Sequence, residues 1–203
     1  MVIEETLHKA NMKVEDVEAI AVTQGPGLVG SLHVGVQAAK TLAWAYNKPL
    51  VPVHHIAGHI YANQLITELK FPLLALVVSG GHTELVYMKD EWSFEILGTT
   101  QDDAIGEAGD KVGRVLGLPY PGGVYVDKIA KDGKPIYSLA KPKTENELDF
   151  SFSGLKSSVL QFIDRCKRKN ETFRPEDLAA SYQETAFETL LSRAKIAIEK
   201  YNP

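Results

Sequence analysis

Two short apolar segments rich in β-branched residues, 19–23 and 49–53, are separated by a stretch of helical composition. The first ends at the breaker Gln24-Gly25-Pro26-Gly27, and a helix is predicted over 31–46 before the second strand. Helical composition returns after residue 53 and continues to Leu69. This alternation of strand, helix, strand and helix predicts an α/β structure.

The pattern changes near residue 71. Residues 73–78 and 83–88 flank Ser79-Gly80-Gly81-His82 and predict a hairpin, with 94–97 as a third antiparallel strand. Helical periodicity dominates the remainder, over 104–116, 124–131, 154–167 and 175–201. We therefore expect an α/β fold with a mixed sheet.

Two domains are expected, residues 1–70 and 71–203. The first predicted helix, 4–13, has no strand before it to pack on, and the last helix stops at Pro203 without returning to a sheet. We therefore expect a chain that is incomplete at both ends.

Composition narrows the class of protein. A hydrophobic content of 44% over 203 residues is enough to bury a core, and no apolar run is long enough to cross a bilayer. We expect a cytoplasmic protein without a membrane partner. The single cysteine, Cys166, excludes an internal disulfide framework and a cysteine-based zinc cluster, so a metal site would use histidines and carboxylates.

Charge gives a weaker indication about partners. The net charge of −4 argues mildly against a general nucleic-acid binder, because phosphate affinity comes mainly from Lys and Arg. Segment 162–174, however, carries five basic residues against two acidic ones, Asp164 and Glu171. A solvated helix end and an RNA contact explain this segment equally well.

The glycine loop of residues 25–30 formally matches the dinucleotide pattern G-x-G-x-x-G between a strand and a helix. No Asp or Glu occurs from Ala19 to Thr67, so no acid follows to hold a ribose hydroxyl, and NAD binding is disfavoured. A tight turn explains the loop better than a phosphate site.

Three histidines occur within six residues, directly after the second predicted strand. On a helix His55 and His59 are one turn apart on one face, as two ligands of a divalent metal must be, while His54 points elsewhere. A pair of surface or capping histidines is the alternative, and the clustering after a buried strand favours the metal. No third ligand can be assigned from these residues.

The segment Val78-Ser79-Gly80-Gly81-His82-Thr83 has two interpretations. One is a hairpin turn in which the glycines supply positive φ. The other is a cradle for phosphate or carboxylate oxygens, formed by glycine amides with the Ser79 and Thr83 hydroxyls beside them. The residues alone do not decide between them.

An acidic and glycine-rich segment follows. Asp103, Glu107 and Asp110 would share one face near the start of a helix. Glycines at 106, 109, 113 and 117 cost about 1 kcal/mol each inside a helix, so a neighbouring helix or a bound ligand must approach that backbone. Further along, Asp127 lies one turn inside a helix that begins after 120–123. We expect ligand contact in this group.

Taken together, six segments in order resemble the tRNA N6-adenosine threonylcarbamoyltransferase family, once described as glycoproteases: 24–28, 54–59, 78–83, 102–108, 120–123 and 149–156. The resemblance implies a two-lobed actin-like ATPase (ASKHA, ribonuclease H-like) fold, incomplete in this chain. It also implies transfer of a threonylcarbamoyl group from threonylcarbamoyl-AMP to the exocyclic amine of the adenosine beside the anticodon.

The resemblance assigns roles by position. His55 and His59 match the two metal-ligating histidines, for one divalent iron or zinc ion per subunit. The substrate-binding positions, for threonylcarbamoyl-AMP or ATP, are matched by Val78, Ser79, Gly80, Gly81, His82, Asp110, Gly123 and Asp127. No catalytic residue is assigned. The implied partners are tRNA and the other subunits of a transfer complex, a paralogous actin-like protein and an ATPase.

Three features of the family are missing from this chain: its N-terminal phosphate hairpin, an asparagine-glycine substrate loop and the aspartate that is the third metal ligand. A truncated, non-catalytic scaffold is therefore an alternative, although the metal histidines are retained. A metallopeptidase is less favoured, because Ile56 stands where H-E-x-x-H needs its glutamate.

Overall fold

The computed structural model describes residues 2–203, which divide into two compact units. The N-terminal unit is Met1–Leu69 and the C-terminal unit is Lys70–Pro203. The elements of the N-terminal unit are α1 (Val2–Ala10), η1 (Val14–Asp16), β1 (Ile20–Gly25), α2 (Val29–Ala45), β2 (Leu50–His54), α3 (His55–Tyr61) and η2 (Ala62–Leu65). Those of the C-terminal unit are β3 (Leu73–Val78), β4 (Thr83–Met88), β5 (Glu95–Thr99), α4 (Ile105–Val115), α5 (Gly122–Ala130), α6 (Ser153–Lys169) and α7 (Pro175–Tyr201).

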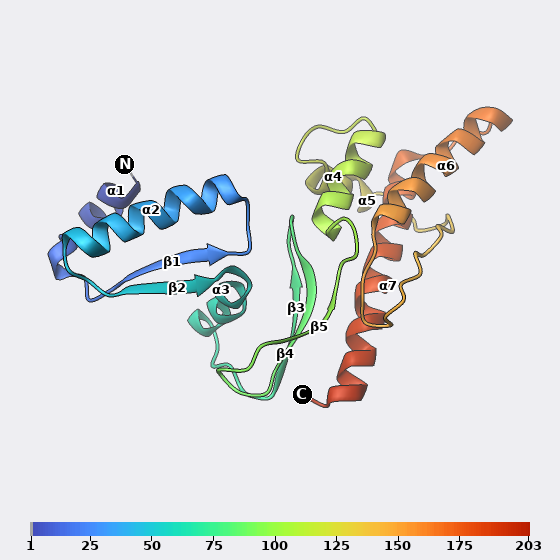
Figure 1. The fold of residues 1–203 in the computed structure, drawn as a ribbon. Coiled ribbons are helices and arrows are strands. Elements are labelled where there is room, and N and C mark those ends of the chain that lie inside the picture. The colour runs from blue at the N-terminus through green and yellow to red at the C-terminus, as the bar shows by residue number, and fades with distance from the viewer. Residues whose placement is uncertain (1) are drawn as a thin grey trace. The chain divides into compact units, whose positions relative to one another are not determined.

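The N-terminal unit is built on a parallel pair of strands. β1 pairs with β2 from Ile20 opposite Leu50 to Gly25 opposite His54. Parallel neighbours need a crossover connection, and α2 supplies it and lies along the strands (Figure 1). The chain passes directly from β2 into α3, so the carboxyl end of β2 positions the histidine segment.

The C-terminal unit contains an antiparallel meander in the order β3-β4-β5. β3 and β4 pair from Leu73 opposite Met88 to Val78 opposite Thr83, which leaves a four-residue turn at 79–82. Helix α7 runs beside these strands (Figure 1). The core between strands and helices is centred on fully buried side chains: Leu85, Phe150, Phe152, Leu155, Val159 and Leu178.

The expected mixed sheet is wrong. The described residues 2–203 form two separate sheets, one parallel and one antiparallel, and each lies in its own unit. The connections explain the difference: a crossover helix imposes parallel pairing on β1 and β2, whereas short turns between β3, β4 and β5 permit only antiparallel pairing.

Helix α4 has a seam of glycines that permits backbone contact. A Cβ on Gly106 would lie 2.8 Å from the Gly80 Cα of the β3–β4 turn, and one on Gly113 would lie 2.5 Å from the Gly122 Cα at the start of α5. Gly109 faces the Gly123 Cα in the same way, at 3.3 Å. The close approach expected from the helical glycines is therefore made by the chain itself.

We expect Gly113→Ala to lower the free energy of unfolding by about 1–3 kcal/mol, because its methyl group cannot enter without moving the α5 backbone. Urea unfolding measures the change. Gly35→Ala is the matched control, since this mid-helix glycine of α2 has only the Val22 side chain near its Cβ direction, at 3.9 Å. It should be neutral or stabilising by up to about 1 kcal/mol. Equal effects of the two substitutions would contradict the close backbone contact between α4 and α5 at Gly113.

Candidate functional site

The histidine pair lies on one face of α3. The His55 and His59 Nε2 atoms are 3.2 Å apart, and the ring centroids are 4.5 Å apart in an edge-to-face arrangement. Ile56 and Ile60 are buried and anchor the helix, so the imidazoles are left on its more accessible side. Two ligand nitrogens at about 2.0–2.1 Å from a tetrahedral zinc would be separated by about 3.3 Å. The spacing of the pair therefore fits two ligands of such an ion.

His54 has a different place. It is the N-cap of α3, and its Nδ1 accepts a hydrogen bond from the Ala57 amide at 3.5 Å. Among residues 2–203, no group of three His, Cys, Asp or Glu side chains is placed to hold a metal ion. The described residues therefore offer two candidate ligands, His55 and His59, without a third beside them.

A side chain closes the β3–β4 turn. Neither Gly80 nor Gly81 has a positive φ, so that expectation was wrong. Instead the Ser79 hydroxyl oxygen closes the turn by accepting hydrogen bonds from the amides of His82 at 2.9 Å and Gly81 at 3.3 Å. Thr83 is fully buried, and its hydroxyl accepts from the first amide of α4, that of Ile105. Thr83 therefore supports α4 and is not available to a cradle.

Asp110 joins α4 to α5. Its Oδ1 accepts a hydrogen bond from the Gly123 amide at 2.8 Å, in the first turn of α5. A carboxylate there satisfies an otherwise unpaired amide and is favoured by the helix dipole. Two of the expected ligand-contact positions, Asp110 and Gly123, are thus brought into direct contact.

The expected acidic face is only partly present. Helix α4 begins at Ile105, so Asp103 precedes it. Lys111 bonds both Asp103 and, at 2.9 Å, Glu107, and these hydrogen bonds raise the pKa of Lys111. Lys111 bridges these two carboxylates and offsets one of their two negative charges, whereas Asp110 bonds the start of α5.

Asp127 is held from two sides. The Gln183 Nε2 of α7 donates to Asp127 Oδ1 at 2.8 Å, and Lys131 Nζ lies 3.0 Å from Oδ2. The bond from Gln183, followed by that from Lys131, lowers the pKa of the Asp127 carboxyl. Sequence patterns did not reveal Gln183, because it lies 56 residues from its partner.

A cavity of about 230 Å³ lies where α4, α5 and α7 meet the end of β3. It brings together two predicted positions, Val78 and Gly123, and adds two that the sequence did not reveal, Tyr182 and Gln183. Its remaining walls are Ile105, Gly106, Gly109, Val126, Ala186 and Phe187. Asp110 bonds a wall residue and Asp127 bonds another, so both carboxylates adjoin the cavity lining.

Two further segments that carry the resemblance, 102–108 and 149–156, have structural roles. Asp102 accepts hydrogen bonds from the amides of Phe152 and Ser153 and from the hydroxyls of Ser151 and Ser153, at the start of α6. Burial acts to raise the pKa of Asp102, but these bonds outweigh it and leave the pKa below its ordinary value. Segments 102–108 and 149–156 therefore stabilise each other.

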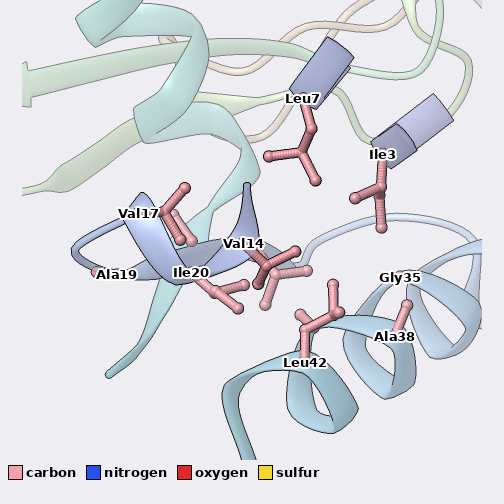
Figure 2. Close-up of a pocket in the computed structure, with 12 residues that line it drawn as sticks. Ile3, Leu7, Val14, Val17, Ala19, Ile20, Gly35, Ala38 and Leu42 are labelled. Carbon is pink, nitrogen blue, oxygen red and sulfur yellow. The ribbon is translucent and has the colours of Figure 1, made fainter. Parts of the chain in front are cut away.

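The N-terminal unit has an apolar cavity of about 340 Å³. Figure 2 shows aliphatic side chains around it, among them Ile3 and Leu7 of α1, Val14, and Leu42 of α2. No titratable side chain lines this cavity, so it offers no acid, base or metal ligand.

If the pair binds a divalent ion, His55→Ala combined with His59→Ala abolishes zinc or iron uptake, because both nitrogens of the pair are removed. Elemental analysis after loading and dialysis measures the bound metal. His54→Ala is the matched control: it should keep the metal, while loss of the helix cap costs about 1 kcal/mol of stability. Unchanged metal in the double variant, or its loss in the control, would rule out this pair.

Comparison with known proteins supports the family resemblance that the six segments indicated. The family model described as tRNA N6-adenosine threonylcarbamoyltransferase matches residues 1–203. Curated relatives of that name from Anoxybacillus flavithermus and Bacillus thuringiensis are 58% and 56% identical over 203 residues, all of this chain. One from Staphylococcus carnosus is 56% identical over 201 residues, 98% of this chain.

The chain spans 60% of the length of the Anoxybacillus relative and 59% of each of the other two. A solved structure, YeaZ from Pseudomonas aeruginosa, aligns over 87% of this chain and 79% of its own with 16% identity and a TM-score of 0.33, a likeness on which no argument is built. Within residues 2–203, no helix is both long and apolar enough to span a bilayer. The match of the family model to the whole of this sequence shows that the chain belongs to the tRNA N6-adenosine threonylcarbamoyltransferase family.

Proposed function

We propose that this chain is part of a cytoplasmic enzyme that transfers the threonylcarbamoyl group from threonylcarbamoyl-AMP to N6 of the adenosine beside the anticodon, in tRNAs that read codons starting with A. Family membership over all 203 residues is the observation that carries the proposal. We also propose that its two units belong to the two lobes of an actin-like fold, and that a paralogous actin-like protein and an ATPase are its partners.

In the proposed reaction, the adenine amine attacks the carbamoyl carbon of threonylcarbamoyl-AMP. A C–N bond forms, the bond from that carbon to the adenylate phosphate oxygen breaks, AMP leaves, and the amine gives up one proton. His55 and His59 would hold one iron or zinc ion, which supplies Lewis-acid chemistry when bound. The residue that accepts the proton is not assigned.

The β3–β4 turn is suited to bind an anionic oxygen of the adenylate. Two of its amides, those of Gly81 and His82, already converge on the Ser79 hydroxyl oxygen. A phosphate or carboxylate oxygen in that place would receive charge-assisted hydrogen bonds, which are roughly twice as strong as neutral ones. We propose that Ser79 holds these amides in convergent directions until the adenylate replaces its oxygen.

The two aspartates are suited to bind hydroxyl groups of the nucleoside. An ionised carboxylate has about four acceptor positions. Asp110 uses one for the Gly123 amide, and Asp127 uses two for Gln183 and Lys131. Each therefore keeps acceptor capacity for a ribose hydroxyl, and the lowered pKa of Asp127 keeps it ionised.

A groove along α6 is suited to bind tRNA phosphates. A cavity of about 450 Å³ is lined by Arg165 and Arg168 together with Ser138, Ser158 and Gln161. The Arg165 guanidinium stacks over the Phe162 ring at 5.2 Å, and no carboxylate among residues 2–203 forms an ion pair with either arginine. Unpaired guanidinium groups bind phosphate well. We propose that segment 162–174 binds RNA through these two arginines and is not merely a solvated helix end.

Deletion of the gene should remove threonylcarbamoyladenosine from tRNAs that read codons starting with A, and a plasmid copy of the gene should restore it. Mass spectrometry of nucleosides from digested tRNA measures the modification. Complementation with the His55→Ala, His59→Ala double variant is expected to fail, while His54→Ala should succeed. Normal amounts of the modified nucleoside in the deletion strain would refute the proposed function.

We expect Arg165→Gln with Arg168→Gln to weaken tRNA binding and to reduce the slope of log Kd against log salt by about 0.7–0.9 for each lost phosphate contact. Filter binding over a series of salt concentrations measures both quantities. Lys89→Gln with Lys195→Gln is the control, because it removes the same charge from two exposed lysines outside the groove. Equal losses in the two double variants would show a general charge effect and no local contact.

A further inference from the structure

Tyr182 of α7 carries a polar group that the chain leaves unsatisfied. The residue is 3% exposed, and its buried hydroxyl has no hydrogen-bond partner among residues 2–203. A buried hydroxyl without a partner bears the full penalty of losing its hydration, and such groups are uncommon in folded proteins. A phenylalanine would fill the same space without that penalty.

Tyr182 itself lines the cavity of about 230 Å³. A Cβ on Gly109, another wall residue, would be 3.9 Å from the phenol oxygen. Gly106, Gly109 and Gly123 bound the cavity space on the side of α4 and α5. Several water molecules, at about 30 Å³ each, or part of a flat ring system fit this space.

The other walls favour a ligand with an apolar face. Ile105, Val126 and Ala186 present aliphatic groups. Val78 and Phe187 also line the cavity and are 48% and 47% exposed, so they lie where it opens to solvent. Mainly apolar walls with a small number of polar groups, here Tyr182 and Gln183, are typical of sites for small organic ligands, in which the polar groups fix orientation.

We propose that Tyr182 is a further ligand-contacting residue of the adenylate site, whose hydroxyl donates a hydrogen bond to an acceptor atom of the adenosine moiety while the apolar walls pack against the base. This rests on the proposed function. Burial, and the nearby carboxylates of Asp103 and Asp110, raise the pKa of Tyr182, so the hydroxyl keeps its proton at neutral pH and remains a donor. The next residue, Gln183, positions Asp127 from the same turn of α7.

The test is Tyr182→Phe in the full chain, with AMP as the probe. We expect AMP affinity to fall about 3- to 10-fold by calorimetric titration, the effect of losing one neutral hydrogen bond. The melting temperature without AMP should stay the same or rise, since an unsatisfied buried hydroxyl is removed. This combination separates a ligand contact from a structural tyrosine.

Tyr137→Phe is the matched control, because Tyr137 belongs to the same unit, packs on the Phe162 ring at 4.4 Å and does not line this cavity. It should leave AMP affinity unchanged. A lower melting temperature for Tyr182→Phe with unaltered AMP affinity would overturn the proposal and indicate an internal or water-mediated partner.

Failure of the wild-type chain to bind AMP would also overturn the inference about Tyr182. The proposed function would then still be decided by the modified nucleoside in tRNA from the deletion strain. The role of Tyr182 and the proposed function can therefore be refuted independently.

Discussion

The candidate substrate site depends on direct backbone contact between α4 and α5. A side chain at Gly113 or Gly122 would collide with the other helix, since a Cβ on either would lie 2.5 or 2.6 Å from the nearest backbone atom. This contact brings the Asp110 carboxylate to the first turn of α5, where it receives the Gly123 amide. The cavity is bounded by the same pair of helices, so its shape follows from the glycine seam.

The seam also connects the turn to the helices. Gly106 packs on Gly80, and the buried Thr83 hydroxyl accepts from the first amide of α4. The turn at 79–82 and the start of α4 are therefore fixed relative to each other by a backbone contact and a hydrogen bond. A ligand that contacts both needs little rearrangement of this part of the unit, which reduces the entropy lost on binding.

Local features were predictable from the sequence. The strands 73–78 and 83–88 and the helix 175–201 agree with β3, β4 and α7, because periodicity and turn residues reflect nearby atoms. The place of His55 and His59 on one helix face follows from a spacing of four. The sequence also predicted that another group packs closely against the α4 glycines. It could not distinguish a bound ligand from a neighbouring helix as that group.

What the sequence did not reveal depends on contacts between distant segments. Tyr182 and Gln183 reach the cavity from α7, more than fifty residues after Asp127, and no local pattern distinguishes them from other buried helix residues. The positive φ expected at Gly80 and Gly81 was wrong because a side chain, Ser79, closes the turn instead. The mixed sheet was wrong because strand pairing depends on how the connections run between elements.

The acids in and near the segments that carry the family resemblance have two kinds of role. Asp102 accepts hydrogen bonds from amides at the start of α6, and Asp149 accepts them from the Thr99 amide and the Gln101 side chain. These two acids therefore stabilise the fold. Asp110 and Asp127 each bond a residue of the cavity wall and keep acceptor positions free. An acid inside a matching segment is thus not necessarily available to a ligand: the hydrogen bonds already made by each carboxylate decide which acids remain available.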